Sequence, residues 1–95
     1  MKTTVGIPAY NEEKNIAKII VESKKFADQI IVCDDGSKDS TVTIAESLGV
    51  IVIKHHKNLG YGSAIHSIFL KAKEINADIL VTIDADGQHE VEDIA

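Results

Sequence analysis

The sequence has a single cysteine, a single proline and no long apolar run. Cys33 lies inside the apolar stretch Ile30-Ile31-Val32-Cys33, so an intrachain disulfide is impossible and a buried thiol is expected. No apolar run approaches the roughly 18 residues that a membrane-spanning helix needs. Met1-Lys2-Thr3-Thr4 leads into a short strand pattern instead of the apolar segment of a signal peptide, so the cytosol is the expected compartment.

The sequence also lacks an excess of basic residues. Ten Lys and Arg face 15 Asp and Glu, which gives a formal charge of −5. This balance argues against nucleic acid as a partner, and a polyphosphate ligand would need a metal ion to bring it in. The apolar content of 44 % is that of one soluble domain, expected over residues 1–95.

Four apolar runs without polar alternation predict strands that are buried on both faces. The expected strands cover residues 3–7, 29–33, 50–53 and 79–83, and apolar residues at helical spacing predict helices at about 12–25, 41–48 and 61–75. Pro8 is expected to end the first strand because it cannot donate a ladder hydrogen bond. Asn11 is expected to cap the first helix, and Gly49 and Asn76 to end the second and third.

Regular alternation of strands and helices predicts an α/β fold. Right-handed crossovers give a Rossmann-like three-layer sandwich whose parallel sheet has the strand order 3-2-1-4. The carboxyl ends of parallel strands share one edge of the sheet, and ligands bind there where the strand order reverses. The polar segments that follow the strands meet at this edge: 8–12, 34–37, 55–58 and 84–89.

The segment Asp84-Ala85-Asp86-Gly87 places two carboxylates one residue apart at the end of a buried strand. Two carboxylates this close repel each other unless a hard cation or several hydrogen-bond donors neutralise their charge. Oxygen ligands without a soft partner favour Mg²⁺ or Mn²⁺, which carboxylates hold together with substrate phosphates. The residues thus predict a nucleoside diphosphate whose metal is bound by Asp86, with help from Asp84. The alternative is an ordinary turn, and the same alternative holds for Asp34-Asp35-Gly36-Ser37.

Three further features lie at this edge of the sheet. His55 and His56 are expected to be solvated loop residues, because no cysteine or other histidine has the spacing of a zinc site. Tyr10 either packs over its loop or offers its ring to a ligand. The pair Gly60-Tyr61-Gly62 lacks the third glycine of a dinucleotide fingerprint, so glycine there is expected to let the third helix begin close to neighbouring backbone.

Four ordered motifs resemble the donor-binding half of family 2 glycosyltransferases, and within them the dolichyl-phosphate mannose or glucose synthases. They are the segments 5–13, 31–41, 58–64 and 84–89. The resemblance covers nearly the whole chain and implies the A-type nucleotide-diphospho-sugar transferase fold and a hexosyltransferase activity. It implies a UDP- or GDP-sugar donor, a Mn²⁺ or Mg²⁺ cofactor and a polyprenyl phosphate acceptor.

The resemblance also implies roles for single residues. Asp35 faces the base, Glu12 reaches the ribose, and Asp84 and Asp86 form the Asp-x-Asp motif at the metal. The implied nucleotide-binding set is Pro8, Ala9, Tyr10, Glu12, Asp35, Asp84, Ala85 and Gln88.

Family members continue for another hundred residues or more, and that half carries the acceptor site, the general base and often membrane-associating helices. No general base can be assigned here, so we expect a piece of a longer protein, inactive alone, whose full-length form lies at the cytoplasmic face of a membrane. Residues 90–95 are expected to open another helix. An uncovered fourth strand would favour a homodimer.

Two other functions fit parts of the pattern. A sugar-nucleotide-forming nucleotidyltransferase shares the fold, but it has a glycine-rich basic loop after strand one, unlike residues 8–13. A non-catalytic nucleotide-binding or interaction module, such as a receiver-like domain, would explain an acidic pair at a strand end. Receiver domains, however, carry that pair after the first strand and not after the second.

Overall fold

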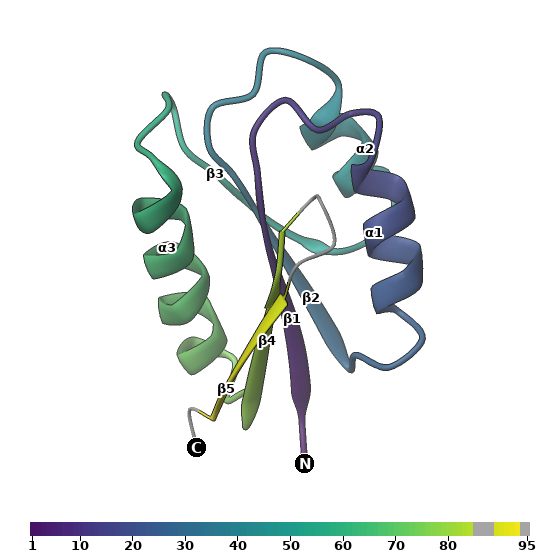
Figure 1. Cartoon of the computed structure of the whole chain (residues 1–95), viewed down its shortest axis with the longest axis vertical. Coiled ribbons are helices and arrows are strands. Elements are labelled where there is room, and N and C mark those ends of the chain that lie inside the picture. Colours follow the sequence, from purple (N-terminus) through teal and green to yellow (C-terminus); the bar gives the residue numbers. More distant parts are fainter. Residues whose placement is uncertain (85–88, 94–95) are drawn as a thin grey trace.

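The chain forms a five-stranded sheet between two layers of helices in a computed structural model that describes residues 1–84 and the backbone of 89–93 (Figure 1). The strands are β1 (Thr3–Ala9), β2 (Gln29–Asp34), β3 (Ile51–Lys54), β4 (Ile79–Ile83) and β5 (His89–Asp93), and the helices are α1 (Ile16–Ser23), α2 (Thr41–Ser47) and α3 (Tyr61–Glu74). The sheet order is β3-β2-β1-β4-β5. The first four strands are parallel, which confirms the predicted order 3-2-1-4.

The two faces of the sheet bury separate apolar clusters. Alternate residues of β1 and β2, such as Val5, Ile7 and Val32, pack against α1 and α2. The residues between them, such as Ile31 and Cys33, pack against α3. Figure 1 shows α1 and α2 on one side of the sheet and α3 on the other. Both faces of the central strands are therefore dry, as their unbroken apolar runs predict.

Pro8 lies inside β1 and does not end it, contrary to the prediction. It pairs with Cys33 of β2, and the strand continues to Ala9. The carbonyl of Ala9 accepts from the N–H of Asp35 on the β2 side, so the backbone of Pro8 faces the β4 side. Pairing with β4 has already ended at Gly6. The missing N–H of Pro8 therefore removes no ladder hydrogen bond.

The first helix begins at Ile16 and not at residue 12, because Asn11 does not cap it. Asn11 has a left-handed φ of 52° and instead joins two loops. Its N–H donates to Ser37 Oγ at 2.7 Å, and its Oδ1 accepts from the N–H of Lys38 at 2.9 Å. These bonds fix the β1–α1 loop against the β2–α2 loop. The other expected helix ends are confirmed, with φ of 76° at Gly49 and 60° at Asn76.

The chain after β4 returns as a strand, so the predicted helix over residues 90–95 is wrong. β5 pairs antiparallel with β4 from His89 to Asp93. β5 therefore covers the edge of β4 that was expected to be exposed. The reason for predicting a homodimer, an uncovered fourth strand, no longer applies. Within the described residues, no helix has the length and apolarity to cross a bilayer.

Candidate functional site

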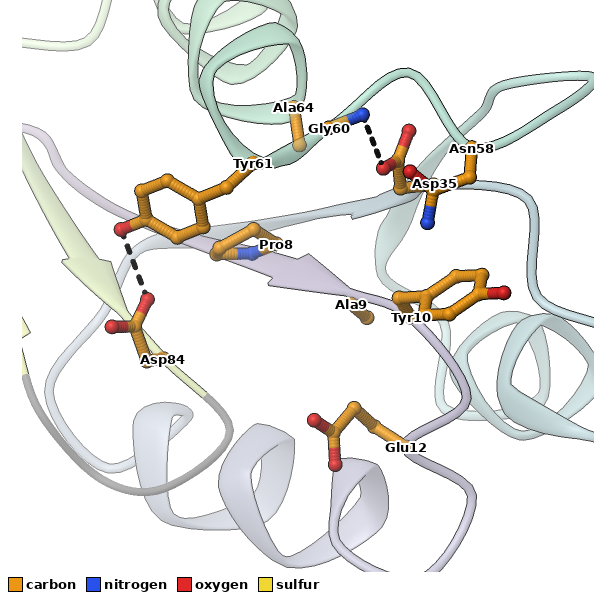
Figure 2. Close-up of a pocket in the computed structure, with 10 residues that line it drawn as sticks. All are labelled: Pro8, Ala9, Tyr10, Glu12, Asp35, Asn58, Gly60, Tyr61, Ala64 and Asp84. Atoms are coloured by element: carbon orange, nitrogen blue, oxygen red, sulfur yellow. Dashed lines mark hydrogen bonds between the residues drawn. The ribbon is translucent and has the colours of Figure 1, made fainter.

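A cavity of about 430 Å³ lies at the carboxyl ends of the parallel strands. Its lining comes from β1 and its loop, from the end of β2, from the start of α3 and from the end of β4 (Figure 2). The lining residues are Pro8, Ala9, Tyr10, Glu12, Asp35, Asn58, Gly60, Tyr61, Ala64 and Asp84. The cavity thus lies where the sheet order changes direction, the position at which such folds bind ligands.

Six of the residues predicted to bind a nucleotide line this one cavity: Pro8, Ala9, Tyr10, Glu12, Asp35 and Asp84. The remaining predicted residues, Ala85, Asp86 and Gln88, lie outside the described residues. Sequence reasoning gave no ligand role to Asn58, Gly60, Tyr61 or Ala64, although they belong to a motif that it had noticed. The position of this motif between β3 and α3, at the carboxyl end of the sheet, is the feature that could have identified them as lining residues.

Asp34 and Asp35 are both buried, yet only Asp35 reaches the cavity. Successive residues of a strand point to opposite faces, so the two carboxylates diverge. Asp34 Oδ2 accepts from the N–H of Ser37 at 2.8 Å, which is the turn that the alternative interpretation expected. The turn interpretation of this segment therefore holds for Asp34, whereas Asp35 lines the cavity and its ligand role stays a prediction.

Asp35 accepts three hydrogen bonds that hold the loop before α3. Its Oδ1 accepts from the N–H of Leu59 at 2.9 Å and from His55 Nδ1 at 2.8 Å, and its Oδ2 accepts from the N–H of Gly60 at 2.9 Å. Burial raises the pKa of this carboxyl. The hydrogen bonds from His55, Leu59 and Gly60 lower it by more than burial raises it, so the net pKa lies below its ordinary 3.8. Asp35 is therefore an ionised acceptor in the cavity wall.

His55 is not the solvated loop residue that was predicted. Its side chain is only 10 % exposed and packs on the α3 face of the sheet. The missed signal is the strand alternation: Ile51 and Ile53 face α3, and His55 continues the same period. His56 is exposed, as predicted.

Gly60 and Gly62 do not serve the close backbone approach that was predicted. A Cβ at either position would meet no atom within 4 Å. Gly60 precedes α3 with a φ of 102°, a conformation that favours glycine. The close approach occurs at Gly36, where a Cβ would lie 2.7 Å from the carbonyl carbon of Lys57 and 2.8 Å from the nitrogen of Asn58.

Asp84 brings a half-buried carboxylate to the cavity at the end of β4. Its Oδ1 accepts from the Tyr61 hydroxyl at 3.1 Å. Figure 2 shows Tyr61 reaching from the start of α3 past Pro8 towards Asp84. Among the described residues no cluster of three metal-ligating side chains occurs. One carboxylate fits Mg²⁺ or Mn²⁺, because one or two carboxylates with substrate phosphates suffice to hold Mg²⁺.

The charges of the cavity have one sign. Glu12, Asp35 and Asp84 contribute carboxylates, and no lysine or arginine occurs among the described lining residues. Such a cavity repels a bare diphosphate, so a polyphosphate ligand would enter only with a cation.

The comparisons with known proteins agree with this geometry. Residues 4–95 match the model of glycosyl transferase family 2. A UDP-N-acetylglucosamine–dolichyl-phosphate N-acetylglucosaminyltransferase of Methanococcus voltae is 44 % identical over 108 residues, which cover 94 % of this chain and 43 % of that protein. A dolichyl-phosphate β-glucosyltransferase of Trichomonas vaginalis is 29 % identical over 103 residues, covering 92 % of this chain and 31 % of that protein.

A solved structure shares the fold. Glucosyl-3-phosphoglycerate synthase of Mycobacterium tuberculosis, in complex with Mn²⁺, UDP and glucosyl-3-phosphoglycerate, superimposes with a TM-score of 0.73 at 28 % identity. The match covers 88 % of this chain and 33 % of that one. The same enzyme has also been solved with Mg²⁺ and UDP. This chain spans less than half the length of each of these relatives. The motifs, the sheet order and the family match together show that the chain belongs to the family 2 glycosyltransferases.

Proposed function

We propose that this chain forms the donor site of a glycosyltransferase that moves a hexose from a nucleoside-diphosphate sugar to a polyprenyl phosphate. The observation that carries the proposal is the cavity itself. It places a buried ionised acceptor, Asp35, opposite a second carboxylate, Asp84, with no basic residue among its described lining. A nucleoside diphosphate with a bound divalent cation is complementary to that arrangement, because the base supplies N–H donors and the cation offsets the phosphate charge.

The relatives support the finer parts of the proposal. The name of the M. voltae relative specifies a UDP-sugar donor and a dolichyl-phosphate acceptor, and the solved synthase binds UDP with Mn²⁺ or Mg²⁺. We therefore propose uracil as the base and a polyprenyl phosphate as the acceptor.

The chain's own residues would position the donor. Asp35 would accept an N–H of the base, and the Pro8-Ala9-Tyr10 segment would line the nucleoside. Glu12 would reach the ribose. Gln88 would lie near the diphosphate or the sugar, with Ala85 beside the nucleotide.

Asp84 and Asp86 would hold the cation. When bound, this ion neutralises the charge that develops on the departing nucleoside diphosphate. We assign no general base to the residues of this chain.

Calorimetric titration of the chain with UDP, GDP, UDP-glucose and GDP-mannose, each with Mn²⁺ or with EDTA, tests the proposal. We expect the UDP ligands to bind in Mn²⁺ and to lose roughly tenfold or more in affinity in EDTA. An Asp84→Asn variant should bind UDP with little response to Mn²⁺. Glu74→Gln, an exposed site at the far end of α3, is the matched control and should bind like the parent.

Two results would count against the proposal. A folded chain that binds no nucleotide would contradict it and favour a non-catalytic interaction module. Equal affinity in Mn²⁺ and EDTA would remove the role of the cation.

A further inference from the structure

A partly buried series of hydrogen bonds lies behind the cavity wall and links α3 to Asp35. His55 Nδ1 lies 2.8 Å from Asp35 Oδ1, and His55 Nε2 lies 2.9 Å from Ser67 Oγ. The Cys33 sulfur lies 3.6 Å from the same Nε2. Asp35 alone of these four residues is among the described residues that line the cavity.

The charge of Asp35 fixes the direction of its bond with His55. Asp35 is ionised and offers only acceptors, so Nδ1 of His55 carries a proton and donates it. In the neutral ring with this tautomer, Nε2 is an acceptor and the Ser67 hydroxyl donates to it. Burial, followed by the nearby charges of Asp35 and Asp34, raises the pKa of Cys33 to about 11, so its thiol keeps its proton and is no nucleophile.

Asp35, His55 and Ser67 have the hydrogen-bond pattern of a nucleophilic triad, but only Asp35 reaches the cavity. Neither His55 nor Ser67 is among the described residues that line this cavity. A hydroxyl without access to a ligand cannot attack one. These hydrogen bonds therefore affect the cavity through Asp35.

We propose that His55 is a positioning residue for the donor site, an inference that rests on the proposed function for the identity of the ligand. By donating to Oδ1, His55 holds the Asp35 carboxylate in the orientation that receives the N–H groups of both Leu59 and Gly60. These two residues connect directly to Tyr61 and the start of α3. His55 thereby sets the position of the wall formed by Gly60, Tyr61 and Ala64.

The arrangement also determines what Asp35 offers to a ligand. Oδ1 already accepts from two donors, whereas Oδ2 accepts only from the N–H of Gly60 among the described residues. A carboxylate oxygen accepts about two hydrogen bonds. Oδ2 therefore presents one remaining acceptor position. Loss of the His55 hydrogen bond would let the carboxylate rotate, and the remaining acceptor position of Oδ2 would no longer have a fixed direction.

Two variants separate positioning from packing. In His55→Asn the amide nitrogen takes the place of Nδ1 and keeps the donor to Asp35. In His55→Gln the longer side chain places its amide near the position of Nε2, so it keeps Ser67 and loses Asp35. Ser67→Ala removes one partner of Nε2, leaves the bond between His55 and Asp35 in place, and is the control.

Two measurements on each full chain give the test: hydrogen exchange of the Leu59 and Gly60 amides, and the affinity for UDP in Mn²⁺. We expect His55→Gln to speed both exchange rates and to weaken UDP binding by roughly ten- to a hundredfold, the effect of losing a hydrogen bond to a charged group. His55→Asn and Ser67→Ala should stay within about threefold of the parent in both measurements.

Equal changes in the Asn and Gln variants would overturn the inference, because loss of packing alone would produce them. Unchanged exchange in His55→Gln would overturn it too. If the parent binds no UDP but exchange still separates the two variants, the positioning of Asp35 by His55 stands and the proposed function fails.

Discussion

At the scale of single residues, burial and strand alternation decide what each carboxylate does. Asp34 and Asp35 are adjacent in sequence, but one closes a turn and the other collects three donors beside the cavity. Buried carboxylates are costly unless donors satisfy them. The hydrogen bonds of Asp35 therefore stabilise the fold as well as shaping the site.

Replacing Asp35 by Asn should lower the free energy of unfolding by about 1.5–3 kcal/mol near neutral pH. The amide has only one acceptor oxygen, and its NH₂ group would face a donor from His55, Leu59 or Gly60. Urea unfolding followed by circular dichroism measures the difference. Asp28→Asn at an exposed loop position is the control, and it should cost less because the Asp28 carboxylate accepts from a single donor among the described residues, the N–H of Thr3.

The Asp35 contribution should also depend on pH in a defined direction. The folded-state pKa lies below the ordinary 3.8, so its stabilisation is present above 3.8 and is lost as the pH falls through the lower folded value. The difference in stability between the parent and Asp35→Asn should therefore be largest above 3.8 and shrink below it. Unfolding measured over this acid range checks the sign. A difference that grows towards acid would contradict the assignment of Asp35 as the ionised acceptor.

At the scale of elements, the loops that follow β2 and β3 are held together by close backbone contact. Gly36 has a φ of 85° and touches the backbone of Lys57 and Asn58, and Asn58 lines the cavity. The β2–α2 turn thereby supports the loop that leads into α3. Side-chain volume at residue 36 would push that loop out of place.

Gly36→Ala and Gly49→Ala form a matched pair. Both glycines have positive φ, at 85° and 76°, but a Cβ at Gly49 would meet nothing within 4 Å. Gly49→Ala should cost about 1–2 kcal/mol of stability, the price of a left-handed alanine. Gly36→Ala should cost about 1–3 kcal/mol more from the clash and should weaken UDP binding. Denaturation and calorimetry measure the two effects, and equal costs in the two variants would contradict the contact.

The close packing of α3 on the sheet gives a second prediction at this scale. A Cβ at Gly6 would clash with Cγ2 of Ile68. Gly6→Ala should therefore cost about 1–3 kcal/mol by overpacking. The same change in an Ile68→Ala background should cost clearly less, because the clashing group is gone. A double-mutant cycle by urea unfolding measures the coupling, and strictly additive costs would refute the contact.

Elements with strong apolar patterns were predictable from the sequence, and those fixed by distant contacts were not. Unbroken apolar runs gave the four parallel strands and their order, while Gly49 and Asn76 marked helix ends correctly. The start of α1 depends on bonds from Asn11 to Ser37 and Lys38, which no local pattern reveals. Likewise, Pro8 fits inside β1 only because β4 stops pairing at Gly6.

The candidate site shows the same division. Residues that follow apolar strands, such as Asp35 and Asp84, were found because parallel strands end at one edge. The burial of His55 was missed because it depends on α3 packing over this side chain. The strand β5 was missed because its pairing with β4 overrides the local preference of acidic residues for the start of a helix. Asp86, Ala85 and Gln88 stay predictions.

At the scale of the whole molecule, the parallel sheet gathers dispersed acidic residues into one cavity at one end. A second cavity, of about 310 Å³, lies near the other end of β2 and β3, between Lys24, Gln29 and Gly49. The two ends of the sheet thus give an internal comparison for any ligand. We expect the nucleotide and the cation to bind at the first cavity and not at the second.

The most direct measurement of that claim is a nitrogen–proton correlation spectrum of the chain during titration with UDP in Mg²⁺, followed by a trace of Mn²⁺. We expect UDP to shift the amides of Tyr10, Asp35 and Gly60 and paramagnetic Mn²⁺ to broaden resonances around Asp84 first. The resonances of Gly49 and Val50 should stay unchanged. Shifts confined to Gly49 and Val50, or no shifts in a folded chain, would contradict the placement of the donor site at the carboxyl ends of the strands.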